Sequence, residues 1–215
     1  MIEKDFDGAE RILRHAAELF EELSLFGRNY TLNLLAPRCY IGETRQWRGD
    51  LDSAMEHFRD CIGQCSDAGL FWGLSHFHAH AADAALDMGD WGLVRHHIEE
   101  GTTLFESCRG GHCGSLLYSL KAILEAQDGR ADEVRAALEK ADWLSAIGKR
   151  SWRAAQLMAK AWAASRVGRG ALNGGRLGAL LSRTPQSYAE ESAALYAAIG
   201  AAGRARFVRR TFGLE

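Results

Sequence analysis

Apolar residues recur along this 215-residue chain at the three- and four-residue steps of a helix, and the helical windows themselves recur every forty residues. A glycine marks the same point in three windows, with a small residue seven positions before it and apolar or small residues five, nine and twelve positions after it. The glycines are Gly49, Gly89 and Gly129; the preceding small residues are Gly42, Ala82 and Ala122; the following residues are Ala54, Val94 and Val134, then Phe58, Ile98 and Leu138, then Cys61, Gly101 and Ala141. A fixed period of this size indicates a stacked repeat array.

The chain has only two prolines and no alternation of β-branched residues, which favours an all-α fold of about eleven helices. We expect one repeat domain over residues 1–215, in which Pro37 bends or interrupts a helix and Pro185 breaks the array. The expected elements are a half-repeat over 6–24, helix pairs over about 29–64, 70–107, 114–146 and 151–182, and a less regular pair over 188–211.

The first expected helix has an apolar stripe that we predict to be buried. The stripe consists of Ile12, Ala16, Leu19, Phe20 and Leu23. This helix has the pattern of the second helix of a repeat, with no first helix before it. Either the native chain begins with a half-repeat or the sequence is a piece of a longer protein, and we favour the second. Because a cut array leaves apolar stripes uncovered at its ends, we also expect self-association through the first or last helix.

The first complete window can be compared with a known repeat. It carries Ile41-Gly42, then Gly49-Asp50, and then Ala54 and Phe58 four residues apart. This pattern resembles the tetratricopeptide repeat. The period of forty is longer than that family's usual thirty-four, and it is similar to the longer repeats of multi-domain bacterial transcription activators and nucleotide cyclases.

The resemblance implies a right-handed superhelical stack of antiparallel helix pairs, whose first helices line a concave groove. It implies a non-catalytic protein–protein interaction or regulatory scaffold that binds a peptide or partner helix there. The fourth and fifth windows fit less well, since Asn173 and Arg209 stand at the alanine and aromatic positions. The acidic centre of the groove predicts a basic or amphipathic peptide as partner. By analogy with the family, the groove residues are Cys39, Glu43, Gln46, Trp47, His76, His80, Asp83, Asp87, Met158, Trp162 and Arg166.

An alternative function comes from His76, His80 and Asp83, which stand at i, i+4 and i+7 of one expected helix and therefore share a face. Two imidazoles and a carboxylate at this spacing fit an open metal site, which would make the chain a ligand- or metal-binding sensor. The same residues also fit polar packing positions of a repeat, and both interpretations stay open. No glutamate stands between the histidines, which excludes the metalloprotease motif.

Other histidines, cysteines and arginines are expected to have structural or solvated positions. We expect His96 and His97 to face solvent, and Cys61 and Cys65 to pack as small hydrophobic residues. A group of arginines near the end of the chain is expected to form a solvated basic face. These are Arg204, Arg206, Arg209 and Arg210.

The composition narrows the classes of function. A net charge of −2 gives no reason to expect attraction to nucleic acid or membranes, and no apolar run approaches a membrane span. The amino-terminal residues lack a secretory signal, and five irregularly spaced cysteines do not form a disulfide framework, so a reducing cytoplasm is expected. No glycine-rich phosphate loop and no nucleophile–base arrangement occur, so we expect neither an enzyme nor a cofactor.

Overall fold

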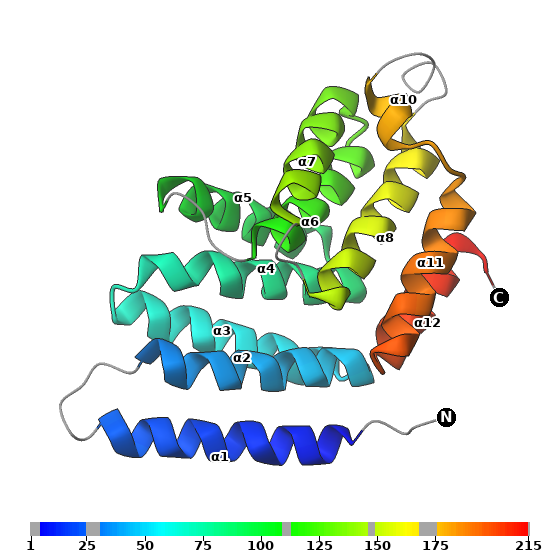
Figure 1. Ribbon diagram of the computed structural model, residues 1–215. Coiled ribbons are helices and arrows are strands. Elements are labelled where there is room, and N and C mark those ends of the chain that lie inside the picture. The colour runs from blue at the N-terminus through cyan, green and yellow to red at the C-terminus, as the bar shows by residue number, and fades with distance from the viewer. Residues whose placement is uncertain (1–4, 25–30, 109–112, 146–148, 168–175, 215) are drawn as a thin grey trace.

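The computed structural model describes residues 5–24, 31–108, 113–145, 149–167 and 176–214, and within these ranges the protein is all-helical, without strands (Figure 1). The described helices number eleven, which confirms the all-α prediction. They are α1 (Phe6–Ser24), α2 (Thr31–Arg48), α3 (Leu51–Asp67), α4 (Phe71–Met88), α5 (Trp91–Ser107), α6 (Gly114–Gln127), α7 (Ala131–Leu144), α8 (Arg150–Arg166), α10 (Arg176–Leu180), α11 (Pro185–Ala198) and α12 (Ala202–Phe212). Across the described residues, none of these helices has the length and apolarity that crossing a membrane requires.

The forty-residue pattern marks the turn within each of three helix pairs. Gly49, Gly89 and Gly129 have φ values of 94°, 75° and 75°, a left-handed conformation that glycine adopts without steric cost. The apolar positions five and nine residues later are buried in all three pairs. The small position before the turn lies where the helices cross: a β-carbon on Gly42 would come within 2.7 Å of the Phe58 ring.

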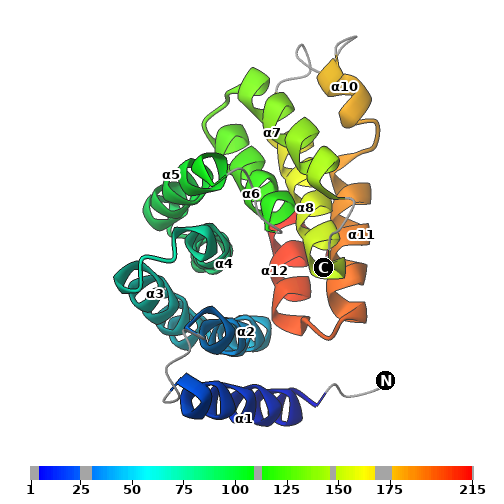
Figure 2. The same cartoon turned by 60° about the vertical axis from the view of Figure 1, so that its left-hand side comes forward.

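The helix pairs follow one another in a curved row (Figure 2). Helix α2 packs on α3, α4 on α5 and α6 on α7. The first helices of successive pairs, α2, α4, α6 and α8, also contact one another in that order. We call the side of α2, α4 and α8 that is turned toward α12 the inner face.

The fourth pair differs from the prediction. Within the described residues, its expected second helix is represented by the five-residue helix α10, which packs on α7; the earlier part of that expected helix falls in residues 168–175, outside the described ranges. Helix α8 packs instead on α11, where the Ser192 hydroxyl donates to the carbonyl oxygen of Ala154 at 2.7 Å. Helix α11 therefore lies beside α8, where the prediction placed the second helix of this pair.

Neither proline interrupts a helix. Helix α2 continues through Pro37. Pro185 begins α11 rather than breaking the array, and the Thr184 hydroxyl caps this helix by accepting a hydrogen bond from the Ser187 amide at 3.2 Å. Proline suits the first turn of a helix, because its missing N–H would have no partner there.

Helix α12 turns back across the inner face. It follows α11 through a tight turn at Gly200, with φ of 84°, and reaches α2 near the start of the array. Figure 2 shows α12 on the inner side of the curved row, between α4 and α11. Because α11 already lies along α8, the last helix, α12, lies on the inner face.

The apolar stripe expected to be buried in α1 is largely exposed. Ile12, Leu19 and Leu23 are 72%, 45% and 43% exposed, while Ala17 is buried on the side that faces α2. The prediction was wrong because polar contacts orient this helix.

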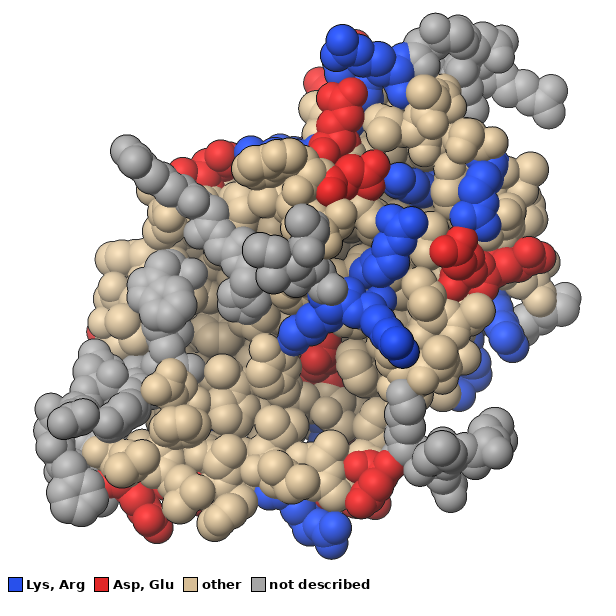
Figure 3. Space-filling model, in the orientation of Figure 1, with Lys and Arg blue, Asp and Glu red and all other residues tan. Residues whose placement is uncertain are grey.

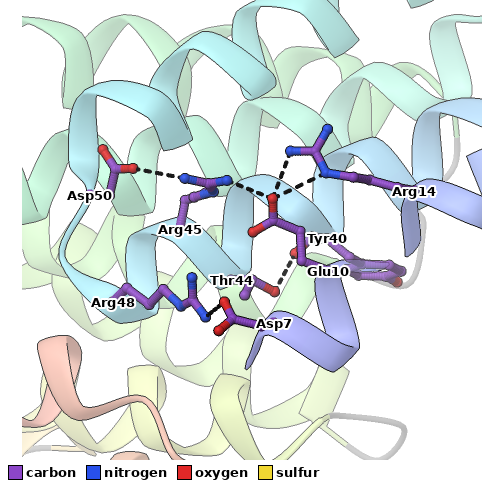
Figure 4. Close-up of polar contacts among 8 residues, drawn as sticks. All are labelled: Asp7, Glu10, Arg14, Tyr40, Thr44, Arg45, Arg48 and Asp50. Atoms are coloured by element: carbon purple, nitrogen blue, oxygen red, sulfur yellow. Dashed lines mark hydrogen bonds and ion pairs between the residues drawn. The ribbon is translucent and has the colours of Figure 1, made fainter. Parts of the chain in front are cut away.

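These polar contacts run between α1 and α2, as Figure 4 shows. Arg45 donates to the Glu10 carboxylate at 2.5 Å, and Arg48 donates to Asp7. Burial raises the pKa of Glu10, but hydrogen bonds from Arg45 and Arg14 outweigh that effect and leave it below its usual value. The apolar side of α1 is left facing outward.

The outward side of α1 predicts reversible self-association of the protein. An Ile12→Lys/Leu19→Lys variant should remain monomeric at concentrations where the parent chain dimerises, because the variant places charges on the apolar surface. Sedimentation velocity over a concentration series measures this. Trp143→Lys, which changes an exposed residue on α7, is the matched control and should associate like the parent. A parent chain that stays monomeric throughout would contradict the prediction.

A pair of histidines is buried between α4 and α5. The Nδ1 atoms of His78 and His97 lie 3.1 Å apart, so one ring donates a hydrogen bond to the other. His97 was expected to face solvent and does not, whereas the neighbouring His96 is exposed. Burial lowers the pKa of both rings to about 4, and repulsion from the neighbouring histidines adds to this effect.

This pair predicts acid sensitivity. The unfolded chain protonates these rings near pH 6.5, whereas the folded chain does so only near pH 4. Their contribution to the free energy of unfolding is therefore complete above about pH 6.5 and is lost as the pH falls toward 4. Urea titrations should show a flatter profile for His78→Asn/His97→Asn than for the parent, with the exposed His15→Gln as control. Equal slopes for all three would contradict the prediction.

Candidate functional site

Arg204 of α12 is fully buried, at 0% exposure, and its guanidinium lies between two carboxylates of α4. Nη2 donates to Asp83 Oδ1 at 2.6 Å, and Nη1 donates to Asp87 Oδ1. The two acids are one helical turn apart, so α4 presents both on one side. The expectation that Arg204 belongs to a solvated face is wrong.

Gln46 of α2 holds the second oxygen of each carboxylate. Its Nε2 donates to Asp83 Oδ2 at 3.1 Å and to Asp87 Oδ2 at 3.0 Å. Each acid is therefore bonded on one oxygen by the arginine and on the other by the amide. This bracing orients both carboxylates toward the guanidinium.

Aromatic and sulfur groups enclose the remaining sides of the guanidinium. Nη2 donates to the Tyr196 hydroxyl oxygen at 3.3 Å and lies 4.0 Å from Met158 Sδ. The guanidinium carbon lies 5.1 Å from the centre of the Tyr196 ring and 5.5 Å from that of Phe207, within the range of cation–π attraction. We call Arg204, Asp83, Asp87, Gln46 and Tyr196 the Arg204 site.

The Arg204 site holds two carboxylates for one guanidinium. Burial raises the pKa of Asp87 to about 6, and the nearby Asp83 carboxylate adds to this rise, although Arg204 opposes it. Burial also raises the pKa of Asp83. Burial and the repulsion between the two carboxylates therefore favour protonation of these acids, whereas the Arg204 guanidinium favours their charged forms.

Gly203 brings the start of α12 into backbone contact with the end of α2. A β-carbon at this position would lie 2.7 Å from the carbonyl oxygen of Trp47 and 3.2 Å from the amide nitrogen of Gly49. Both are backbone atoms, which cannot swing aside as a flexible side chain could. The absence of a side chain at Gly203 therefore allows Arg204 to reach the acids.

The other end of α12 contacts α8. The ring of Phe212 packs edge-on against Trp162, with ring centres 5.8 Å apart. A cleft of about 370 Å³ beside the first turn is lined by residues that include Gln46 and Asp87, and another of about 640 Å³ beside the last turn includes Trp162 and Arg166. Helix α12 thus lies along the inner face without filling it.

The predicted groove residues fall into two groups. One group lies on the inner face along α12 and consists of Gln46, Trp47, Asp83, Asp87, Met158, Trp162 and Arg166, of which Arg166 is exposed. The other lies farther along α2 and α4 and consists of Cys39, Glu43, His76 and His80. The acidic centre of the groove was expected to be open to solvent. Helix α12 covers it instead.

The surface view agrees with this placement. In Figure 3 basic side chains gather around the region of α8, while acidic side chains are scattered over this face without forming one acidic surface. The acids that were expected to define a groove are those buried under α12.

A cluster of metal-ligand type lies between α2 and α4. Cys39, His76 and His80 are buried, and each offers a ligand atom within 4.8 Å of the other two. Asp83, expected as the third ligand beside the histidines, binds Arg204 and Gln46 instead. The residues of metal-ligand type that lie together therefore come from two helices, and Asp83 is not one of them.

Arg204 was missed as a site residue although the sequence carries a signal for it. Ala201, Ala205 and Val208 recur at helical spacing and are buried. Arg204 adjoins Ala205 and stands one turn before Val208, so it lies on the same side of the helix. Asp83 and Asp87 lie more than a hundred residues earlier in the chain, so the pattern around Arg204 does not indicate them as its partners.

Comparison with known proteins does not assign the chain to a family. A search of protein families found no match, and neither the curated proteins nor the solved structures compared with the sequence gave one. The tetratricopeptide resemblance therefore stays a prediction, and the function is argued from the geometry of α12 and the inner face.

The Arg204 site predicts strong energetic coupling. Arg204→Met should lower the free energy of unfolding by about 3–5 kcal/mol, because it leaves two buried carboxylates without their cation. Adding Asp83→Asn and Asp87→Asn should restore at least about half of that loss, since no buried charge then remains. Urea denaturation measures both. The control is Arg206→Met, an exposed arginine of the same helix, which should change stability by less than about 0.5 kcal/mol. Equal effects of the two arginine variants would contradict the coupling.

Proposed function

We propose that this chain is a non-catalytic interaction module of the tetratricopeptide type, a right-handed superhelical array whose concave side binds a helix that presents an arginine. In this proposal α12 occupies the binding face of its own chain and keeps it closed until a partner helix of similar chemistry displaces it. The module acts as a regulatory part of a cytoplasmic protein, and its partner is a protein or peptide rather than nucleic acid or membrane.

The observation that carries this proposal is the complete enclosure of Arg204 by groups from other helices. Two carboxylates and an amide, braced by one another, face one guanidinium. Paired acids match the planar, multi-donor geometry of arginine better than that of lysine. Recognition of an amphipathic helix by a groove uses side-chain anchors on one helical face. Helix α12 provides such a face with Arg204 at one end and Phe212 at the other.

The way in which α12 is attached supports its displacement. It is joined to α11 by a single turn at Gly200, and clefts remain beside both of its ends. Its outer side carries exposed Arg206, Arg209 and Arg210, which keep it soluble when it leaves the inner face. Release would expose the two acids, together with Phe207, Val208 and Phe212 of α12.

A labelled peptide tests the proposal. The peptide copies residues 201–214, and its binding to the full chain is measured by fluorescence anisotropy. The full-chain variant Gly203→Ala should bind it about 5- to 150-fold more tightly than the parent chain, since the added methyl weakens docking of its own α12 by about 1–3 kcal/mol. The peptide keeps Gly203 and so suffers no such clash.

Two controls separate this effect from general loosening of the fold. Gly63→Ala, in α3, adds a methyl where no atom lies within 4 Å and should bind the peptide like the parent chain. A peptide with Arg204→Ala should bind the Gly203→Ala chain at least about tenfold more weakly than the native peptide. The proposal fails if both peptides bind equally, or if Gly203→Ala binds no better than the parent.

A further inference from the structure

The pair of helices α2 and α4 carries a second polar cluster apart from the Arg204 site. His76 and His80 are one turn apart on the same side of α4, with ring centres 4.7 Å apart. Cys39 of α2 faces them, and the three ligand atoms lie within 4.8 Å of one another. The cluster is buried in the seam where the two helices pack.

The spacing of these atoms is close to that of a coordination sphere. Metal–nitrogen and metal–sulfur bonds of about 2.0–2.3 Å in a tetrahedral site place neighbouring ligand atoms roughly 3.5 Å apart. Closing the present distances therefore takes movements of about 1 Å or less, which side-chain rotation within one rotamer well supplies. The backbone of α2 and α4 need not move.

The chemistry of the donors selects the ion. One thiolate and two imidazoles are borderline-to-soft ligands, which suit Zn²⁺ and not the oxygen-seeking Mg²⁺ or Ca²⁺. We propose that Cys39, His76 and His80 form a Zn²⁺ site that joins α2 to α4, with a fourth position open to water or a small ligand. As the sulfur–zinc bond forms, the Cys39 thiol releases its proton to solvent, while the neutral imidazoles bind through their lone pairs.

The surroundings of the cluster favour a cation. The ring of Phe58 stacks on His80 at 5.7 Å and Tyr40 packs edge-on against His76 at 6.3 Å, so aromatic rings support both imidazoles. Glu43 lies one turn after Cys39 on α2. Burial raises the pKa of its carboxyl to about 7, and the Lys149 ammonium opposes that rise. A bound ion would favour the charged carboxylate. Tyr40 and Glu43 are only partly buried, so they mark the approach to the site.

Cobalt provides the probe. The reduced full chain, freed of metal with a chelator that is then removed, is titrated with Co²⁺ and followed by visible and near-ultraviolet absorption. We expect one equivalent to bind with a thiolate-to-cobalt charge-transfer band and the intense d–d bands of a tetrahedral ion. Zn²⁺ should then displace it stoichiometrically and raise the melting temperature, because it binds only the folded chain.

Matched variants locate the site. Cys39→Ser should lose the charge-transfer band and bind at least about 100-fold more weakly, and His80→Gln should weaken binding similarly. Cys61→Ser is the control, since Cys61 is also buried but lies outside the cluster on α3, with its sulfur 3.6 Å from the Leu35 carbonyl oxygen.

The spectrum of the parent chain decides the question even where a variant fails to fold. Cobalt binding without a thiolate band would overturn the proposal, because Cys39 would then not be a ligand of the ion. An unchanged spectrum in a folded Cys39→Ser variant would do the same. No partner helix enters these measurements, so their outcome is independent of the peptide-binding proposal.

Discussion

A guanidinium removed from water needs its charge compensated, and that requirement at Arg204 constrains much of this molecule. Desolvating an arginine costs several kcal/mol, so the residue can occupy the interior only where acceptors are already in place. Asp83 and Asp87 meet the condition because a helix brings residues four apart to one side, and Gln46 fixes their orientation. Such a buried ion pair contributes little net stability compared with apolar packing, and its best-attested role is to specify one arrangement among alternatives. Here it sets the position of α12 on the inner face.

The parts of the fold that depend on local spacing could be predicted from the sequence. Gly89, Val94 and Ile98 occupy the turn and core positions that the forty-residue period indicates, because glycine conformation and helix–helix contact are decided within one pair. The outward stripe of α1 could not be predicted, since its orientation depends on ion pairs with α2. The pairing of α8 with α11 depends on how much helix forms between them, which periodicity alone does not determine.

The difference between local spacing and contacts of distant helices also explains which residues of the candidate sites could be predicted and which could not. Helical spacing brought His76 and His80 together correctly, but it assigned Asp83 as their third partner because only one helix was considered. The packing of α2 against α4 supplies Cys39 to the histidines and commits Asp83 to the Arg204 site. The two sites therefore share one pair of helices, and polar residues line that pair at successive turns. Other positions of the helices supply most of the apolar core. The polar positions between α2 and α4 can therefore take part in binding.

The backbone contact between Gly203 and Trp47 also bears on how the chain unfolds. In an array whose repeats touch only their neighbours, stability is nearly a sum of local terms, and one end can melt while the other remains folded. Helix α12 joins positions 121 residues apart through Arg204 and Asp83, and it contacts α2, α4 and α8 together. Loss of structure at either end of the row then removes the surface on which α12 rests. With α12 in this position we expect the helices to unfold as one cooperative unit, and the release proposed above would leave the pairs held only by contacts with their neighbours.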